Sequence, residues 1–163
     1  MVETLADREV DVAYIQDTRW RGSGCRFFGA KSKRYKLFWM GGKERSDGVG
    51  MFVAEKWVDS VVSAEKHSER VLILKMVLEN IGLLNVLTVH DSHSGKPEEE
   101  KQNFWNEMFS LVSCIPQNEM VVLAGDINGM LEVIMLAMME CMVVMGMELV
   151  MQVAPGFWSL HTG

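Results

Sequence analysis

The segment "VVLAGDINGM", residues 121 to 130, ends an apolar run with Asp126 and Asn128, two positions apart. A strand that is apolar at consecutive positions is usually covered on both faces, so polar residues at its end face solvent or a ligand. Because residues i and i+2 of a strand share one face, this carboxylate and carboxamide can reach one metal ion or one phosphate together. The alternative is a turn, where Gly, Asp and Asn are common.

The whole-chain composition describes one soluble domain. The chain has 163 residues, of which 48% are apolar and 23% are charged, which is ordinary for a globular protein. Its three cysteines are widely spaced and include no CxxC pair, so they support neither a disulfide framework nor a zinc site. The charged opening "MVETLADREVD" gives no sign of a secretory leader. We therefore expect an intracellular protein, nuclear or cytoplasmic, without a membrane partner.

Basic residues are concentrated near the N-terminus. The stretch 19 to 45 holds nine Lys and Arg residues against one acid, Glu44, whereas residues 102 to 163 hold no Lys or Arg. Aromatic residues interleave with these cations, a pairing that is common in nucleic-acid grooves. DNA is thus the expected partner, and the residues expected to contact it are Arg19, Arg21, Lys31, Lys33 and Arg34. The alternative is a solvated loop whose aromatic residues belong to the core.

The elements expected around these residues are mostly strands. A helix end is expected within residues 2 to 9, and a helix is expected over 97 to 115, where Pro97 and three glutamates open a segment with one apolar face. Short strands are expected at residues 10–16, 35–40, 48–54, 59–65, 70–78 and 83–90, and a return strand at 121–126. This order predicts an α+β fold made of antiparallel hairpins, one long helix and a returning strand.

Residues 130 to 151 differ from the rest of the chain because eight of these 22 positions are methionine. We expect a helix that is apolar on all sides, with Glu132, Glu140 and Glu148 excluding a bilayer span. A methionine-rich surface that binds a partner is the alternative.

Several segments in a fixed order carry a resemblance to a known family. These segments are "VDVAYIQDTRWRGS", "RSDGVGMFVAE", "SERVLILKMVLE", "LLNVLTVHDSHSG", "EEEKQNFWNEM" and "VVLAGDINGM". Together they resemble the endonuclease/exonuclease/phosphatase superfamily, and most closely the endonuclease domain of LINE-type (non-LTR) retrotransposons and the craniofacial development protein 2-like sequences. The resemblance covers residues 2 to 129. It implies the N-terminal half of a four-layer α/β/β/α sandwich of the DNase-I-like kind.

The resemblance also implies metal-assisted hydrolysis of a phosphodiester, with Mg²⁺ or Mn²⁺ as cofactor. Asp17 stands where the family's "QET" strand end supplies a Glu to the metal. His90 stands where its "YAP" segment supplies a Tyr near the scissile phosphate. Asp126 and Asn128 match the Asp and Asn of its "GDFN" motif, which act on the phosphate and the nucleophile.

Several departures from the family pattern weaken the implied activity. Asp17 is one methylene shorter than Glu, and His90 changes charge with pH as a phenol would not. The family's Asn-bearing first strand would precede Met1, and its later "QxD" strand and terminal Asp-His pair have no counterpart. We therefore expect a DNA endonuclease that is weak or inactive. The alternative is a catalytically silent remnant that binds nucleic acid or protein, because losing members of a catalytic set costs orders of magnitude in rate.

The chain is expected to divide into a partial endonuclease domain, residues 1 to 129, and a divergent tail, residues 130 to 163. Half a sandwich would leave one inner sheet face exposed, which the tail could cover. A shifted reading frame from near Met130 is a hypothesis for the methionine content, since out-of-phase reading of the family's loop generates many ATG codons. Sequencing the transcript and translating all three frames tests it, and the hypothesis fails if no frame restores the family's motifs.

Overall fold

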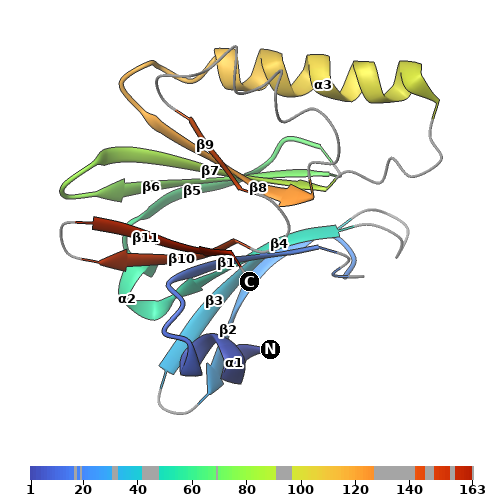
Figure 1. Cartoon of the computed structure of the whole chain (residues 1–163). Coiled ribbons are helices and arrows are strands. Elements are labelled where there is room, and N and C mark those ends of the chain that lie inside the picture. Colours follow the sequence, from blue (N-terminus) through green and yellow to red (C-terminus); the bar gives the residue numbers. More distant parts are fainter. Residues whose placement is uncertain are drawn as a thin grey trace.

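The computed structural model describes residues 1–16, 18, 20–30, 33–41, 48–68, 70–90, 97–126, 142–145, 149–154 and 157–162. For residues 126 onward it describes the backbone alone. The chain has a mixed α+β fold with two mostly antiparallel sheets (Figure 1). The candidate residues Asp17, Arg19, Lys31 and Asn128 lie outside the described residues.

The first sheet has six strands in the order β11-β10-β1-β4-β3-β2, and every neighbouring pair is antiparallel. Its strands are β1 (Val12–Gln16), β2 (Ser23–Ala30), β3 (Lys33–Gly41), β4 (Gly48–Ala54), β10 (Leu149–Ala154) and β11 (Phe157–Thr162). The sheet therefore joins the N-terminal strands to the last two described strands of the tail.

The second sheet has five strands in the order β5-β6-β7-β8-β9. Its strands are β5 (Val61–Lys66), β6 (Val71–Leu78), β7 (Gly82–His90), β8 (Met120–Asp126) and β9 (Met142–Met145). The first three are antiparallel, whereas β8 is parallel to both β7 and β9. Helix α3 (Glu98–Ser113) lies between β7 and β8 in the chain, and such a crossover is what a parallel pair requires.

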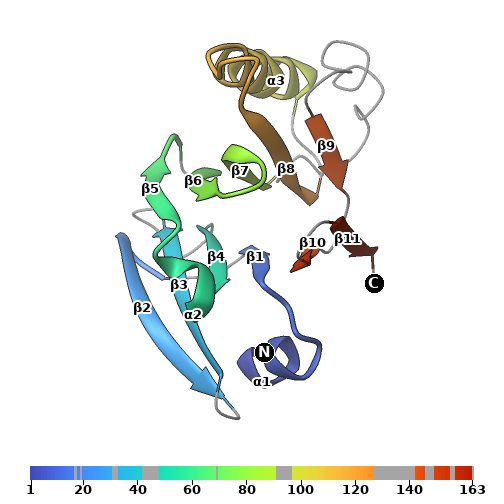
Figure 2. The ribbon, with the colours of Figure 1, turned by 90° about the vertical axis from the view of Figure 1, so that its left-hand side faces the viewer.

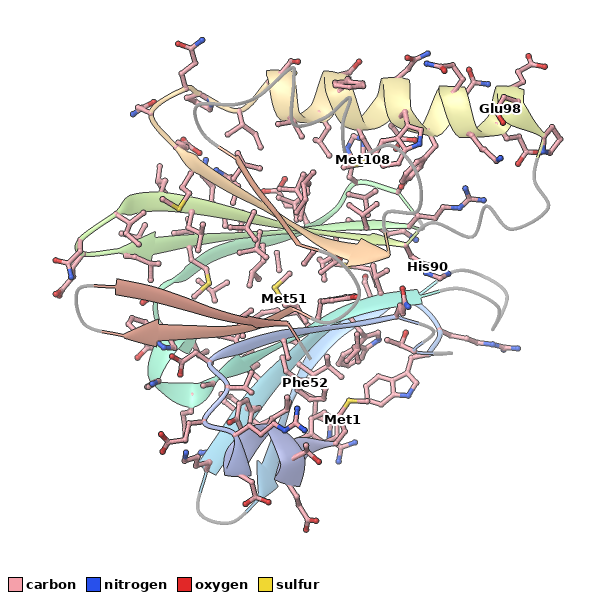
Figure 3. All side chains as sticks on the ribbon, viewed as in Figure 1. Met1, Met51, Phe52, His90, Glu98 and Met108 are labelled. Atoms are coloured by element: carbon pink, nitrogen blue, oxygen red, sulfur yellow. The ribbon has the colours of Figure 1, made fainter. Side chains whose placement is uncertain are left out.

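The two sheets pack face to face around the main hydrophobic core. That core combines Met51 and Val53 of the first sheet with Leu74 and Val86 of the second, and all four side chains are buried. Figure 3 shows Met51 between the two sheets. The expectation that one inner sheet face would be exposed is therefore wrong, because the N-terminal segments supply strands to both sheets and each covers the other.

Helices cover the outer faces of both sheets (Figure 2). Phe104 and Met108 of α3 pack on Leu87 and Leu123, on the face of the second sheet that points away from the first. Leu5 of α1 (Val2–Asp7) packs in a cluster on the outer face of the first sheet. That cluster also contains Phe52, which points toward α1 in Figure 3. The layers therefore run from α3 through the two sheets to α1.

Most of the expected elements are confirmed, within one to three residues at their ends. The long helix was expected over 97–115 and spans 98–113, with Phe104 and Met108 on its buried face. The strand expected over 48–54 has those bounds, and all its residues are buried, as expected for a fully covered strand. The antiparallel hairpins and the returning strand are also present.

Two elements in the N-terminal part were not expected. Strand β2 falls in the basic stretch, where Gly24 and Gly29 obscure any strand pattern, yet it pairs with β3 along its whole length. Helix α2 (Glu55–Val58) is a single turn that follows β4. Neither element has a periodic apolar pattern, so pairing and packing with distant residues determine both.

The helix expected in the methionine-rich segment is wrong for the residues described there. Residues 142–145 and 149–154 are strands, and residues 130–141 lie outside the described part. Strand β9 pairs with β8 and strand β10 pairs with β1, so both complete ladders whose backbone groups would otherwise lack partners. The β-branched pair Val143 and Val144 favours this outcome. Among the helices that the structure describes, none combines the length and apolar character needed to cross a bilayer.

Candidate functional site

The C-terminal ends of β1 and β7 meet at one edge of the sandwich. Strand β1 ends at Gln16 in the first sheet, and β7 ends at His90 in the second. The Nδ1 atom of His90 lies 3.0 Å from Oε1 of Gln16, and Figure 3 shows His90 at this edge, between the sheets. Because an amide oxygen can only accept, Nδ1 carries the proton in this arrangement and donates it to Gln16. This contact positions the imidazole at the edge of the sandwich.

The pleat of β7 explains the orientation of His90. Leu84 and Val86 lie in the core between the sheets, whereas Leu87 and Val89 pack under α3. With a period of two, His90 belongs to the face that looks toward the first sheet. Its backbone N–H donates to the carbonyl of Arg70 at 3.0 Å, which holds the end of β7 against the start of β6.

Strand β8 brings Asp126 to the same edge. In the parallel register of β7 and β8, His90 stands opposite Asp126 and Val89 stands opposite Gly125. A Cβ atom at position 125 would collide with the backbone carbonyl of Val89. The close approach of the two strands therefore requires glycine at position 125, directly before Asp126.

Residues next to Gln16 extend the edge. Asp17 follows it directly but lies outside the described residues. The Thr18 backbone N–H donates to the carbonyl of Gly48 at 3.2 Å, which ties this segment to the start of β4. The Thr18 hydroxyl is buried and has no hydrogen-bond partner in the described part of the chain. A Cβ atom at Gly48 would contact this hydroxyl, so glycine leaves it room.

The donor chemistry of this edge suits a hard cation only if the aspartates contribute. The amide oxygen of Gln16 and the hydroxyl of Thr18 are oxygen donors, which Mg²⁺ prefers, whereas imidazole is less suited to it. Within the described residues, no group of three or more His, Cys, Asp or Glu side chains is placed to hold a metal.

Two of the cations expected to contact nucleic acid are engaged within the protein. Lys33 donates to the carbonyl of Ala6 at 3.2 Å and pairs with Glu9 at 3.4 Å. Arg34 forms an ion pair with Glu55 at 2.8 Å. Arg21 is exposed, next to the start of β2. The sequence alone does not distinguish these three residues, because their partners lie 21 to 27 positions away for the two that are paired.

The aromatic residues of the basic stretch divide between core and surface. Tyr35 is 1% exposed, and its burial, with a smaller effect of the Asp11 carboxylate, raises the pKa of its phenol. Phe38 is also buried, whereas Trp20 and Phe27 are each 38% exposed. The alternative that these aromatics belong to the core therefore holds for Tyr35 and Phe38 and fails for Phe27.

A polar cavity lies beside the candidate edge, against α3. Its volume is about 330 Å³, and the residues that line it are Ser68, Arg70, Glu100, Asn103, Phe104 and Glu107. The Nε2 atom of His67 lies 3.2 Å from Oε1 of Glu107, and this contact connects the turn before β6 to the helix. The cavity adjoins the edge through Arg70, whose carbonyl holds His90.

At the opposite end of β7 and β8, a buried polar cluster is fully paired. Asn85 donates to Glu119 at 2.8 Å, and the Lys75 ammonium lies 2.9 Å from the same carboxylate. The hydrogen bond from Asn85, followed by that from Lys75, lowers the pKa of Glu119. This cluster was not expected from the sequence. Because its polar groups hydrogen-bond to one another, we interpret it as structural.

Comparisons with known proteins add no family assignment. No family model matches the chain, and no curated protein matches it.

Proposed function

We propose that this protein is a weak metal-dependent phosphodiesterase acting on DNA, related to the DNase-I-like endonucleases of LINE-type retrotransposons. The observation that carries the proposal is the meeting of three strand ends, which brings His90 next to Gln16 and opposite Asp126. The layer order, with two sheets between outer helices, is compatible with the four-layer sandwich of that superfamily.

In this proposal each residue at the edge has a separate role in the hydrolysis of a phosphodiester. Gln16 positions the His90 ring at the edge, and the imidazole acts on the phosphate. Asp126 orients the attacking water, and Asn128 holds the phosphate. These are the chemical roles that the sequence resemblance implies for the matching positions. The low activity follows from His90 and Asp17, which replace the family's Tyr and Glu.

A bound Mg²⁺ would neutralise the phosphate and lower the pKa of the attacking water. The residues that would hold it are Asp17 and Asp126, with the neutral oxygens of Gln16 and Thr18 nearby. Oxygen donors of this kind fit Mg²⁺ or Mn²⁺ and do not favour a softer metal.

Nicking of supercoiled plasmid tests the proposal. We expect slow nicking that requires Mg²⁺, stops with EDTA, and falls by at least about 100-fold in Asp126→Asn, since the substitution removes a charge from the reacting site. Asp59→Asn is the matched control, because Asp59 is an exposed aspartate at the end of α2. It should nick at the wild-type rate.

A nicking rate that is the same in Asp126→Asn and the wild type would show a contaminating nuclease and overturn the proposal. Circular dichroism of both variants should match that of the wild type, so that a folding defect is recognised. If Asp59→Asn loses activity as well, the effect of Asp126→Asn cannot be assigned to the edge and the proposal also fails.

A second candidate is a module that binds nucleic acid without cleaving it. The presence of Asp17 and His90 in place of the family's Glu and Tyr favours it, because losing members of a catalytic set costs orders of magnitude in rate. Binding of an oligonucleotide in EDTA, together with no Mg²⁺-dependent nicking at any enzyme concentration, would select this candidate over hydrolysis.

A further inference from the structure

The exposed face of the β2–β3 hairpin carries an aromatic ring between cations. Phe27 of β2 stands opposite Lys36 of β3, and Arg34 lies two residues before Lys36, on the same face of β3. We refer to Phe27, Arg34 and Lys36 as the Phe27 surface. The end of β2 and the start of β3 lie away from α3 in both ribbon views (Figures 1 and 2).

The distances within the Phe27 surface are those of cation–π contacts. The Arg34 guanidinium carbon lies 4.5 Å from the centre of the Phe27 ring, and the Lys36 ammonium lies 5.6 Å from it. The Lys36 ammonium is also 5.2 Å from the ring centre of Phe38, a core residue. Two rings thus hold this cation in place, while Phe27 keeps 38% of its surface exposed.

The charges of the Phe27 surface are only partly balanced. Arg34 is neutralised by Glu55, as described above. Lys36 forms no ion pair with any residue that the structure describes. Phe27 therefore offers a partly exposed ring beside a cation that has no acidic partner among the described residues.

We propose that the Phe27 surface binds single-stranded nucleic acid, with an unpaired base stacked on Phe27 and its phosphate at Lys36. An aromatic face accepts any unstacked base, whereas bases inside a duplex are already stacked on each other. The positive charge complements the phosphate backbone. This inference rests on the proposed action on a nucleic acid, and it adds that a single strand is preferred to a duplex.

Fluorescence anisotropy with a labelled oligothymidine and a duplex of equal length, both in EDTA, tests the inference. We expect tighter binding of the single strand, and about tenfold weaker binding in Phe27→Leu, which keeps an apolar side chain but removes the stacking face. Lys36→Gln should lower the slope of log affinity against log salt by about 0.7, whereas Lys36→Arg should retain it.

The matched control is Lys101→Gln, which removes a lysine from α3, on the opposite side of the molecule. It should bind like the wild type. Equal affinity for duplex and single strand, or unchanged binding in Phe27→Leu, would overturn the inference. Displacement of the oligonucleotide by polyglutamate at a similar concentration would also overturn it, in favour of an acidic protein partner.

Asp126→Asn separates this inference from the proposed hydrolysis. It should bind oligothymidine normally, because binding occurs at the hairpin and needs no metal. Absence of nicking in the wild type with binding that depends on Phe27 would remove the hydrolysis and leave the Phe27 surface. Nicking that is unchanged in Phe27→Leu, with no binding of the single strand, would do the reverse.

Discussion

The two ends of the parallel pair β7–β8 both carry polar residues, but they use them differently. At the start of the strands, Asn85, Lys75 and Glu119 satisfy one another in a buried cluster. At their C-terminal ends, Gln16 of the first sheet hydrogen-bonds to Nδ1 of His90, which stands opposite Asp126 in the register of β7 and β8. A polar cluster whose members pair within one sheet stabilises the fold, whereas a side chain positioned by a hydrogen bond from another element is typical of groups that meet a ligand.

The difference follows from the neighbours available at each end. Near Glu119, a lysine of β6 and an asparagine of β7 reach the same carboxylate within the second sheet. At the other end, the contact between Gln16 and His90 crosses from one sheet to the other. The candidate site is therefore located where the two sheets meet at their edge, and not inside either of them.

The largest effect is expected from Gly125→Ala, which tests whether the candidate end tolerates any added volume. The new methyl group would collide with the backbone of Val89, so β7 and β8 must separate at the edge, at a cost of about 3 kcal/mol in the free energy of unfolding. Urea unfolding measures this cost.

Gly29→Ala is the control for Gly125→Ala, because a Cβ atom at position 29 meets its nearest neighbour, Cγ of Arg34, at an ordinary 3.8 Å. It should change the stability by less than about 0.5 kcal/mol. Similar unfolding midpoints for the two variants would show that the strands do not approach as closely as described.

A smaller effect on stability is expected when the pH is lowered, and it comes from Glu119 in the buried polar cluster. Because its folded-state pKa is lowered, Glu119 contributes stability that is fully present above its unfolded pKa, about 4.3, and is lost as pH falls through the folded value. Glu119→Gln should be less stable than the wild type at neutral pH and should lose less stability on acidification. Urea midpoints measured from about pH 7 to about pH 3 follow this difference.

Glu65→Gln is the matched control for the acid experiment, since Glu65 is an exposed glutamate on β5 of the same sheet. Its midpoints should follow those of the wild type throughout. If Glu119→Gln also follows the wild type, the cluster does not lower the pKa of Glu119 and the paired end is not a stabilising unit.

The sequence predicted the elements whose pattern is local. The apolar run at residues 48–54 and the apolar face of the helix at 98–113 indicate buried surfaces without reference to any other segment. Strand β2 lacks such a pattern because one of its positions, Gly24, is occupied by glycine to leave room for another side chain. A Cβ atom there would lie 2.7 Å from the Trp39 ring, so this glycine lets a distant indole lie on the strand.

The candidate site was predicted only in part, for the same reason. His90 and Asp126 end apolar strands, and that position in the sequence is visible. Gln16 was missed because its role depends on the packing of one sheet on the other, across 74 residues of chain. Lys36 was not separated from Lys33 and Arg34, because only the folded hairpin shows which cations have acidic partners.

The smallest effect on stability is expected from Gln16→Leu, which removes the contact that distinguishes the candidate end. One partly buried side-chain hydrogen bond is worth about 1 kcal/mol, so the protein should remain folded. The His90 ring then loses the acceptor that keeps the proton on Nδ1, and nitrogen chemical shifts of the imidazole should report a mixture of tautomers.

Gln16→Glu is the matching variant, because a carboxylate accepts the same hydrogen bond and should keep the proton on Nδ1. If Gln16 positions His90, the tautomer and any nicking activity should change together in Gln16→Leu, and Gln16→Glu should retain the wild-type tautomer. If the tautomer is unaltered in Gln16→Leu, another group orients the ring. The two ends of β7–β8 would then differ in their charges but not in how firmly their side chains are held.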